Sequence, residues 1–236
     1  MRLSRGIFWL LGLLIISGPS AADQASRQGV YLAPGWGKLS FQAPDAGSYY
    51  LPVMQRSTGG KLIDTDGQQV DLEDLLQDKV TLLSFIYRTC DDVNGCPLST
   101  MVLRTVASRM GKEPDLAEEL RLVTISFDPL NDTPAAMADY EKSIADGIGL
   151  DWHFLTSESD EKIKPILEAY EQFVVRDISS IDGKGKFSHI LRVYLVDQRS
   201  QIRNIYNLSF LHPDILINDV KTLMMERLPE SLAKRI

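Results

Sequence analysis

The chain has few of the residues that form disulfides or bind metals, with two cysteines and three histidines among 236 residues. Two cysteines allow at most one internal disulfide, so the chain is not a disulfide-rich scaffold and needs an apolar core to fold. Basic residues are also fewer than acidic ones, with 25 Lys and Arg against 32 Asp and Glu. The resulting net charge of −7 argues against nucleic acid as a partner.

No apolar run in the sequence reaches the ~18 residues that a membrane-spanning helix needs. The run from Ile7 to Ser17 is too short, and it lies between the basic start Met1–Arg5 and the small residues Gly18–Ala22. This order is typical of a secretory signal, and an uncleaved anchor is the alternative. We therefore predict a signal peptide over residues 1–22, export to the periplasm, and no membrane span in the mature protein.

Both cysteines lie in one loop that follows an apolar, β-rich segment. Residues 80–87 are nearly all apolar, which is the composition of a strand buried on both faces of a sheet. Cys90 is therefore expected at the C-terminal edge of the sheet, where α/β folds place their sites. Pro97 suits the first turn of a helix, so Cys96 is expected at the N-terminus of that helix. There the helix dipole favours the thiolate and lowers the thiol pKa.

The remaining pattern predicts an α/β domain. A second β-rich run at 120–127 is expected to lie parallel to the first, after a right-handed crossover. We further expect a hairpin turning at 66–67, helices at 72–77, 133–145, 157–170 and 213–228, and antiparallel strands at 173–176, 190–196 and 202–206. This order of elements, with a cysteine after the first core strand, is that of a thioredoxin-like fold. The predicted organisation is a signal peptide at 1–22, an extended N-terminal arm at 23–61 and a thioredoxin-like domain at 62–236.

Of the three histidines, His189 is the best candidate for a functional role. His153 is expected to point to solvent or an edge from a short strand, and His212 occupies a cap-like position before a helix. His189 lies where the chain enters a predicted strand, and in a thioredoxin fold this entry lies against the first cysteine. We therefore predict that His189 comes within reach of Cys90 and Cys96. A histidine that only packs within the hairpin is the alternative.

Two thiolates and one imidazole form a soft set of metal ligands. Thiolates favour Cu(I), the imidazole allows Cu(II) to stay bound, and three ligands leave a position open for transfer. Zinc also accepts these ligands, although structural zinc sites usually have four. Without a metal, Cys90 and Cys96 form either a disulfide that staples the loop or a redox pair that reacts with other proteins. A peroxidase is disfavoured because Thr89 directly precedes Cys90, whereas peroxiredoxins resemble Thr-x-x-Cys.

Several segments together resemble the Sco/SenC proteins. They are Phe85–Cys90, Asp92–Val93, Cys96–Pro97, Phe127–Pro129, Asp132–Pro134, Trp152–Thr156, and Ser188–His189 leading to Tyr194–Asp197. The resemblance runs from about Lys61 to the C-terminus and implies a thioredoxin-like, copper-binding protein that helps assemble the copper centre of cytochrome c oxidase. It also implies that copper is held by the cysteines of a Cys-x-x-x-Cys-Pro loop and a distant histidine, here Cys90, Cys96 and His189.

The resemblance therefore implies an assembly factor rather than an enzyme. Such a protein holds copper, as Cu(I) or Cu(II), and passes it to an apo copper protein such as a cytochrome c oxidase subunit, while a thiol reductase is a further expected partner. This chain has five residues between the cysteines instead of three, as if Asn94-Gly95 were inserted. Asn-Gly is strong turn chemistry, so we expect the extra residues to bulge outward and leave the sulfurs close together. The alternative function is a periplasmic thiol–disulfide oxidoreductase acting on cysteines of a copper or haem protein.

Overall fold

The computed structural model describes residues 31–177 and 186–227. The chain divides into two compact units, Met1–Tyr31 and Leu32–Ile236, and the predicted signal peptide lies outside the described residues. All elements named below belong to the second unit. Among the described residues, no helix combines the length and the apolar character that crossing a membrane requires.

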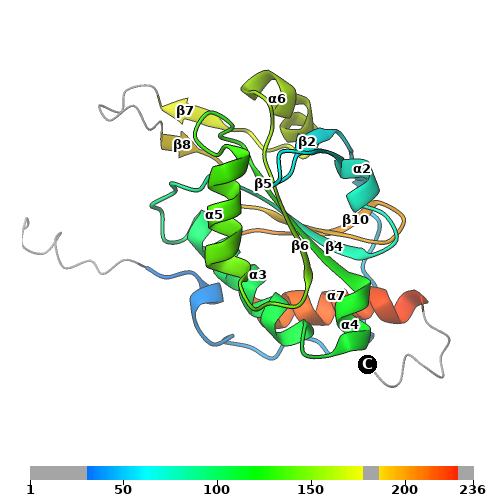
Figure 1. Ribbon diagram of the computed structural model, residues 1–236. Coiled ribbons are helices and arrows are strands. Elements are labelled where there is room, and N and C mark those ends of the chain that lie inside the picture. The colour runs from blue at the N-terminus through cyan, green and yellow to red at the C-terminus, as the bar shows by residue number, and fades with distance from the viewer. Residues whose placement is uncertain (1–30, 178–185, 228–236) are drawn as a thin grey trace, which may run out of the picture. The chain divides into compact units, whose positions relative to one another are not determined.

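A six-stranded mixed sheet forms the centre of this unit, in the order β1-β10-β9-β4-β5-β6 (Figure 1). The strands are β1 (Gln55–Arg56), β4 (Val80–Ile86), β5 (Leu120–Ser126), β6 (Asp151–Leu155), β9 (Val193–Val196) and β10 (Gln201–Tyr206). The predicted parallel pairing of the two β-rich runs is confirmed, with Val80 opposite Leu120 and Ile86 opposite Ser126. Every residue of β4 is buried, as its apolar composition predicts for a central strand.

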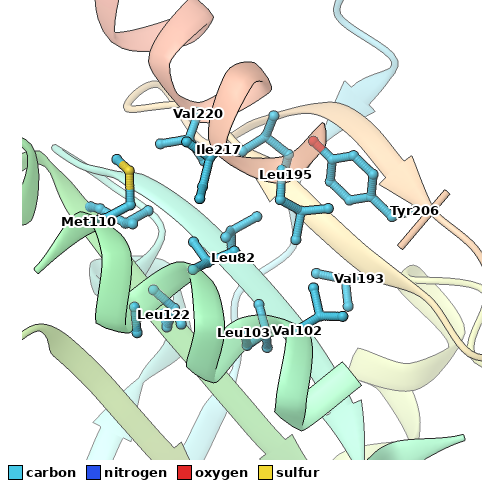
Figure 2. Close-up of a cluster of buried hydrophobic side chains, with 14 of the residues drawn as sticks. Leu82, Val102, Leu103, Met110, Leu122, Val193, Leu195, Tyr206, Ile217 and Val220 are labelled. Atoms are coloured by element: carbon cyan, nitrogen blue, oxygen red, sulfur yellow. The ribbon is translucent and has the colours of Figure 1, made fainter. Parts of the chain in front are cut away.

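Helices cover both faces of this sheet (Figure 1). They are α2 (Leu72–Leu75), α3 (Cys96–Met110), α4 (Pro114–Glu119), α5 (Pro134–Ala145), α6 (Asp160–Ala169) and α7 (Pro213–Arg227). On one face, α3 and α7 pack against each other and against β4. There Leu82, Leu122 and Leu195 of three strands form a single cluster with Val102 of α3 and Val220 of α7 (Figure 2).

The opposite face of the sheet carries a second core cluster, to which α2 and α6 contribute. Successive side chains of a strand point to opposite faces, so Leu83 and Phe85 of β4 face this cluster while Leu82 faces the first. The ring of Phe85 lies 5.3 Å from that of Tyr170 and 6.0 Å from that of Tyr194. The strand that leads to the cysteines is therefore fixed by close packing on both of its faces.

The structure differs from the sequence-based expectation after α6. The sequence predicts that residues 173–176 form one set of antiparallel strands with residues 190–196 and 202–206. Instead β7 (Val175–Asp177) pairs with β8 (Lys186–Ser188) in a separate two-stranded sheet. Strand β9 also begins three residues later than expected, at Val193. Alternation of apolar and polar residues indicates a half-buried strand but does not identify its partner, and this explains the error.

The predicted hairpin at the start of the domain is present, as β2 (Lys61–Ile63) and β3 (Gln69–Asp71). Its turn is longer than the two residues expected, because Asp64 N–H donates to Gln68 O at 2.9 Å and Gly67 N–H donates to Asp64 O at 3.1 Å. The carboxylate of Asp64 also accepts hydrogen bonds from the backbone of Asp66 and Gln68. Gly67 has φ +79°, a conformation that favours glycine.

The described part of the N-terminal arm lies along the domain without forming a hairpin of its own. It contains a short 3-10 helix, η1 (Pro34–Trp36), and ends in β1, which pairs with β10. Along its course Tyr49 O–H donates to Asp219, and the guanidinium of Arg203 donates from Nε to Leu51 O at 2.8 Å. The described part of the arm is therefore anchored to α7 and β10.

Candidate metal centre at the cysteine loop

The cysteine loop, residues 87–95, connects β4 to α3 at the C-terminal edge of the sheet. It contains a turn in which Gly95 N–H donates to Asp92 O at 2.8 Å and Asn94 N–H donates to Asp92 Oδ1 at 3.0 Å. A Cβ atom added to Gly95 would lie 3.2 Å from Cys90 Sγ and from Asp92 O. Glycine at this position therefore allows the turn to approach the Cys90 sulfur closely.

The three ligands predicted from the sequence come together at this edge. Cys90 is partly buried, Cys96 is 2% exposed, and both are free thiols. His189 enters from a segment 93 positions later in the chain, and its Nε2 lies 3.6 Å from Cys96 Sγ. Its Nδ1 is buried and has no hydrogen-bond partner among the described residues.

The side chains at this edge contact each other. Cys96 Sγ lies 3.6 Å from His189 Nε2, and both side chains help to lower the pKa of Cys90. Among residues 31–177 and 186–227, no three His, Cys, Asp or Glu side chains are already arranged to surround a metal ion.

The two thiols differ in acidity. The hydrogen bond from Cys96, aided by those from His189 and the backbone, outweighs burial and lowers the pKa of Cys90 to about 4. The hydrogen bond to Cys90, together with burial, raises the pKa of Cys96 well above its ordinary value. The expectation that the helix N-terminus makes Cys96 the thiolate is therefore wrong. Cys96 does begin α3, but it is buried, and its hydrogen bond to Cys90 favours the thiolate form of Cys90 and the protonated form of Cys96.

A cluster of aromatic rings holds His189 in place. Its ring centroid lies 4.9 Å from that of Phe127 and 6.2 Å from that of Tyr87. The ring of Phe187 packs against those of Tyr87 and Phe127. The guanidinium of Arg176 lies 4.5 Å from the centroid of the Phe187 ring. No sequence pattern described above predicted this role for the aromatic residues. Tyr87 and Phe127 directly follow the adjacent parallel strands β4 and β5, and this shared edge was the signal that could have identified them.

A buried carboxylate fixes the start of the cysteine loop. Asp132 is 0% exposed and accepts hydrogen bonds from Arg88 N–H at 2.9 Å and Ser126 Oγ at 2.6 Å. Arg88 Nε also lies 3.4 Å from Asp132 Oδ1. Burial is the main cause that raises the pKa of Asp132. The backbone two residues before Cys90 is therefore tied to the sheet edge by a group that sequence reasoning did not assign to the site.

A cavity of about 400 Å³ opens beside the loop. Its lining includes Tyr87, Cys90, Asn94, His189, Leu191 and Leu208. Cys96 does not line this cavity. An incoming molecule would therefore meet the Cys90 sulfur first.

The other two histidines have structural roles, as expected. His153 lies on the edge strand β6, and its Nε2 is 2.7 Å from Asp151 Oδ1. His212 Nδ1 accepts a hydrogen bond from Asp214 N–H at 3.1 Å at the start of α7, so its Nε2–H donates to Gly37 O at 3.2 Å. Neither contact involves a cysteine.

The acidity of the two thiols leads to a prediction about their reactivity. In the reduced protein, alkylation by iodoacetamide at about pH 6 is expected to modify Cys90, because a thiolate reacts and a thiol does not. Cys96 is expected to stay unmodified while the protein is folded. Replacement of Cys96 by Ala removes the main donor to Cys90, so the pH profile of Cys90 alkylation should shift to higher pH. Mass spectrometry of the modified peptides measures both rates, and preferential modification of Cys96 would contradict the assignment.

Comparison with known proteins identifies similar sequences and folds. A family model described as SCO1/SenC matches residues 57–225. No curated protein sequence matches the chain.

Among solved structures, the chain is similar to Bradyrhizobium japonicum ScoI with copper bound, at 28% identity and TM-score 0.59, covering 71% of this chain and 99% of that one. It is also similar to BsSco, a member of the Sco family of cytochrome c oxidase assembly proteins in which a disulfide switch was identified, at 25% identity and TM-score 0.56, covering 74% and 98%. The apo Sco1 protein of Thermus thermophilus shares the fold at 22% identity and TM-score 0.61, covering 77% and 98%. The predicted thioredoxin-like fold is thereby confirmed.

Proposed function

The chain belongs to the SCO1/SenC family, and from this premise we propose that it binds copper through Cys90, Cys96 and His189 and delivers it to an apo copper protein. A subunit of cytochrome c oxidase is the proposed recipient. The observation that carries the proposal is the meeting of these three side chains at one edge of the sheet. Support also comes from ScoI, a relative at 28% identity whose structure contains copper, and from BsSco, a member of a family of cytochrome c oxidase assembly proteins.

The chemistry of the three side chains fits copper. Cys90 supplies a thiolate already, because its pKa is about 4. Cys96 would lose its proton when copper replaces the hydrogen bond between the two sulfurs, so copper binding should release a proton. Two thiolates suit Cu(I), and the imidazole of His189 adds a ligand that suits Cu(II).

Copper is the cargo of this site, so the site must release it as well as bind it. Three protein ligands leave one position open, and the cavity at Cys90 gives an incoming ligand access from that side. A thiolate or imidazole of the recipient would enter there, and the protein ligands would then leave one after another. This exchange leaves the oxidation state of copper unchanged.

Anaerobic titration of the reduced protein with Cu(II) tests binding, with the thiolate-to-copper charge-transfer absorption as readout. We expect a stoichiometry of one and a stable band. Mixing the loaded protein with the apo copper domain of cytochrome c oxidase should then transfer the copper, which is measured in each protein after the two are separated. Rapid oxidation of both thiols to a disulfide without a stable band would contradict copper binding, and copper that stays with this protein after separation would contradict delivery.

We place this activity in the periplasm, on the ground of the predicted signal peptide at residues 1–22. Expression of the full chain in a Gram-negative host should yield a mature protein that begins at Asp23 and fractionates with the periplasm. N-terminal sequencing of the purified protein tests the cleavage site, and recovery of an uncleaved chain in the membrane fraction would support the anchor instead.

A thiol–disulfide oxidoreductase is the second candidate, favoured by the low pKa of Cys90 and its position at the cavity. The Cys90 thiolate would attack a disulfide of the target, forming a mixed disulfide and releasing one target thiolate. Cys96, once deprotonated, would attack Cys90 Sγ in the mixed disulfide and release the second thiolate of the target. The target gains two electrons, and the protein is left with a Cys90–Cys96 disulfide. A Cys96→Ser variant should trap the mixed disulfide, and failure to trap any would argue against this activity.

A further inference from the structure

Part of the N-terminal arm contacts the cysteine loop directly, although the family match begins only at residue 57. Trp36 Nε1–H donates to Val93 O at 3.1 Å, and Ala33 N–H donates to Asn94 Oδ1 at 2.8 Å. Val93 and Asn94 are separated from these partners by 57 and 61 positions in the sequence. Both lie between the two cysteines, so the arm contacts the segment that separates the candidate ligands.

The arm makes these contacts from a fixed position. Ala33 is 2% exposed and Gly35 is buried. A Cβ atom added to Gly35 would lie 2.3 Å from Leu211 O and within 3.1 Å of the side chains of Leu98 and Val102. No side chain fits there without displacing the backbone, so η1 packs directly on α3 and on the segment before α7. The two donors, Ala33 N–H and Trp36 Nε1–H, are therefore held in place by the packing of η1 against the core.

The segment that the arm holds is next to the sulfur of Cys90. Asp92 N–H donates to this sulfur, and Gly95 passes so close that a Cβ would lie 3.2 Å from it. Val93 and Asn94 lie between these two residues in the turn. The bonds within the turn set its local shape, and the two bonds from the arm connect it to the core. A shift of Val93 and Asn94 would therefore carry both neighbours of the Cys90 sulfur with it.

From this arrangement we infer that residues Ala33–Trp36 are positioning residues for the candidate metal centre. They hold the cysteine loop in the conformation that keeps the sulfur of Cys90 beside that of Cys96. The inference rests on the proposed function as far as copper is concerned. The effect on the loop itself holds with or without metal.

Two substitutions remove the contacts while leaving the core in place. Trp36→Phe keeps an aromatic ring but removes the N–H donor, and Asn94→Ala removes the acceptor of the bond from Ala33. The matched control is Tyr49→Phe, which removes the hydrogen bond from the same arm to Asp219 of α7, away from the loop. Hydrogen exchange at the amides of Asn94–Cys96 and the alkylation rate of Cys90 are measured on the metal-free protein, and the dissociation constant for Cu(II) on the loaded protein.

Each loop variant is expected to raise the dissociation constant for copper about five- to tenfold, the effect of one lost hydrogen bond. Both should also speed amide exchange at Gly95, whereas Tyr49→Phe should leave exchange and affinity near the wild-type values. Gly35→Ala, which displaces η1 from α3, is expected to act like the loop variants. Equal exchange and equal affinity in wild type, Trp36→Phe and Asn94→Ala would overturn the inference.

The metal-free measurements separate this inference from the proposed function. If the wild type binds no copper but the loop variants exchange faster, the proposed function fails and the positioning role stands. If the wild type binds copper and the loop variants match it in exchange and affinity, the positioning role fails and the proposed function stands. Urea unfolding of each variant shows whether a change is confined to the loop or follows a loss of global stability.

Discussion

Substitution of Cys90 by Ser or of His189 by Ala is expected to raise the dissociation constant for Cu(II) at least about a hundredfold. In the proposed site Cys90 would supply the thiolate at neutral pH, and serine cannot replace it as a soft ligand. His189, whose Nε2 lies 3.6 Å from Cys96 Sγ, would supply the nitrogen ligand. Loss of either leaves two ligands, which is too few to keep copper against competing small molecules.

The variants are compared by anaerobic titration, with the charge-transfer band as the measure of bound copper. His153→Ala is the matched control, because His153 lies on edge strand β6 and pairs with Asp151. Far-ultraviolet circular dichroism should show the same fold in all three variants, since Cys90 and His189 are only partly buried. An unchanged dissociation constant for Cys90→Ser or His189→Ala would remove that residue from the site.

The location of this site was predictable from the sequence because it follows from a buried strand and its end. The uninterrupted apolar run of β4 identifies a central strand, and the polar residues after it place Cys90 at the C-terminal edge. The order of elements then brings the chain back at His189, beside the same edge. The hydrophobic pattern is local in the sequence, whereas the placement of His189 beside Cys90 also depended on the arrangement of elements in a thioredoxin-like fold.

The distribution of charge within the site was not predictable in this way. The position of Cys96 at the start of α3 favours a thiolate there. In the structure the hydrogen bond to Cys90, together with burial, raises the pKa of Cys96 and outweighs the helix dipole. The contact of Trp36 with Val93 escaped prediction for a similar reason. Its two partners are 57 positions apart, and no periodicity in the sequence connects them.

Replacement of Asp132 by Ala is expected to lower the free energy of unfolding by about 3 kcal/mol. The substitution leaves Arg88 N–H and Ser126 O–H without their acceptor in a buried region, and each unsatisfied group costs about 1–3 kcal/mol. Arg88 is exposed and Ser126 is buried, so water can reach the unsatisfied group of Arg88 more easily. The total cost of the two unsatisfied groups therefore stays below the largest value that the two could reach together. Because Arg88 lies near the start of the cysteine loop, the same variant should also bind copper more weakly.

Urea unfolding measures this loss, and Asp64→Ala is the matched control. Asp64 also accepts two hydrogen bonds through its carboxylate, but they lie at the exposed turn between β2 and β3. Water can replace the lost acceptor there, so the control should lose no more than about 1 kcal/mol. Equal losses in the Asp132 and Asp64 variants would show that burial of the carboxylate does not determine its contribution.

The pH dependence of stability provides a second test of the same carboxylate. Burial raises the pKa of Asp132, so the folded protein binds this proton more tightly than the unfolded chain does. The corresponding stability is fully present below the unfolded pKa of about 3.9 and is lost as pH rises through the folded pKa. An Asp132→Asn variant keeps an acceptor oxygen but cannot ionise, so it does not suffer this loss. The difference in unfolding free energy between variant and wild type should therefore shift in favour of the variant as pH rises, and a shift in the opposite direction would mean that the contact with Arg88 outweighs the cost of burying the charge.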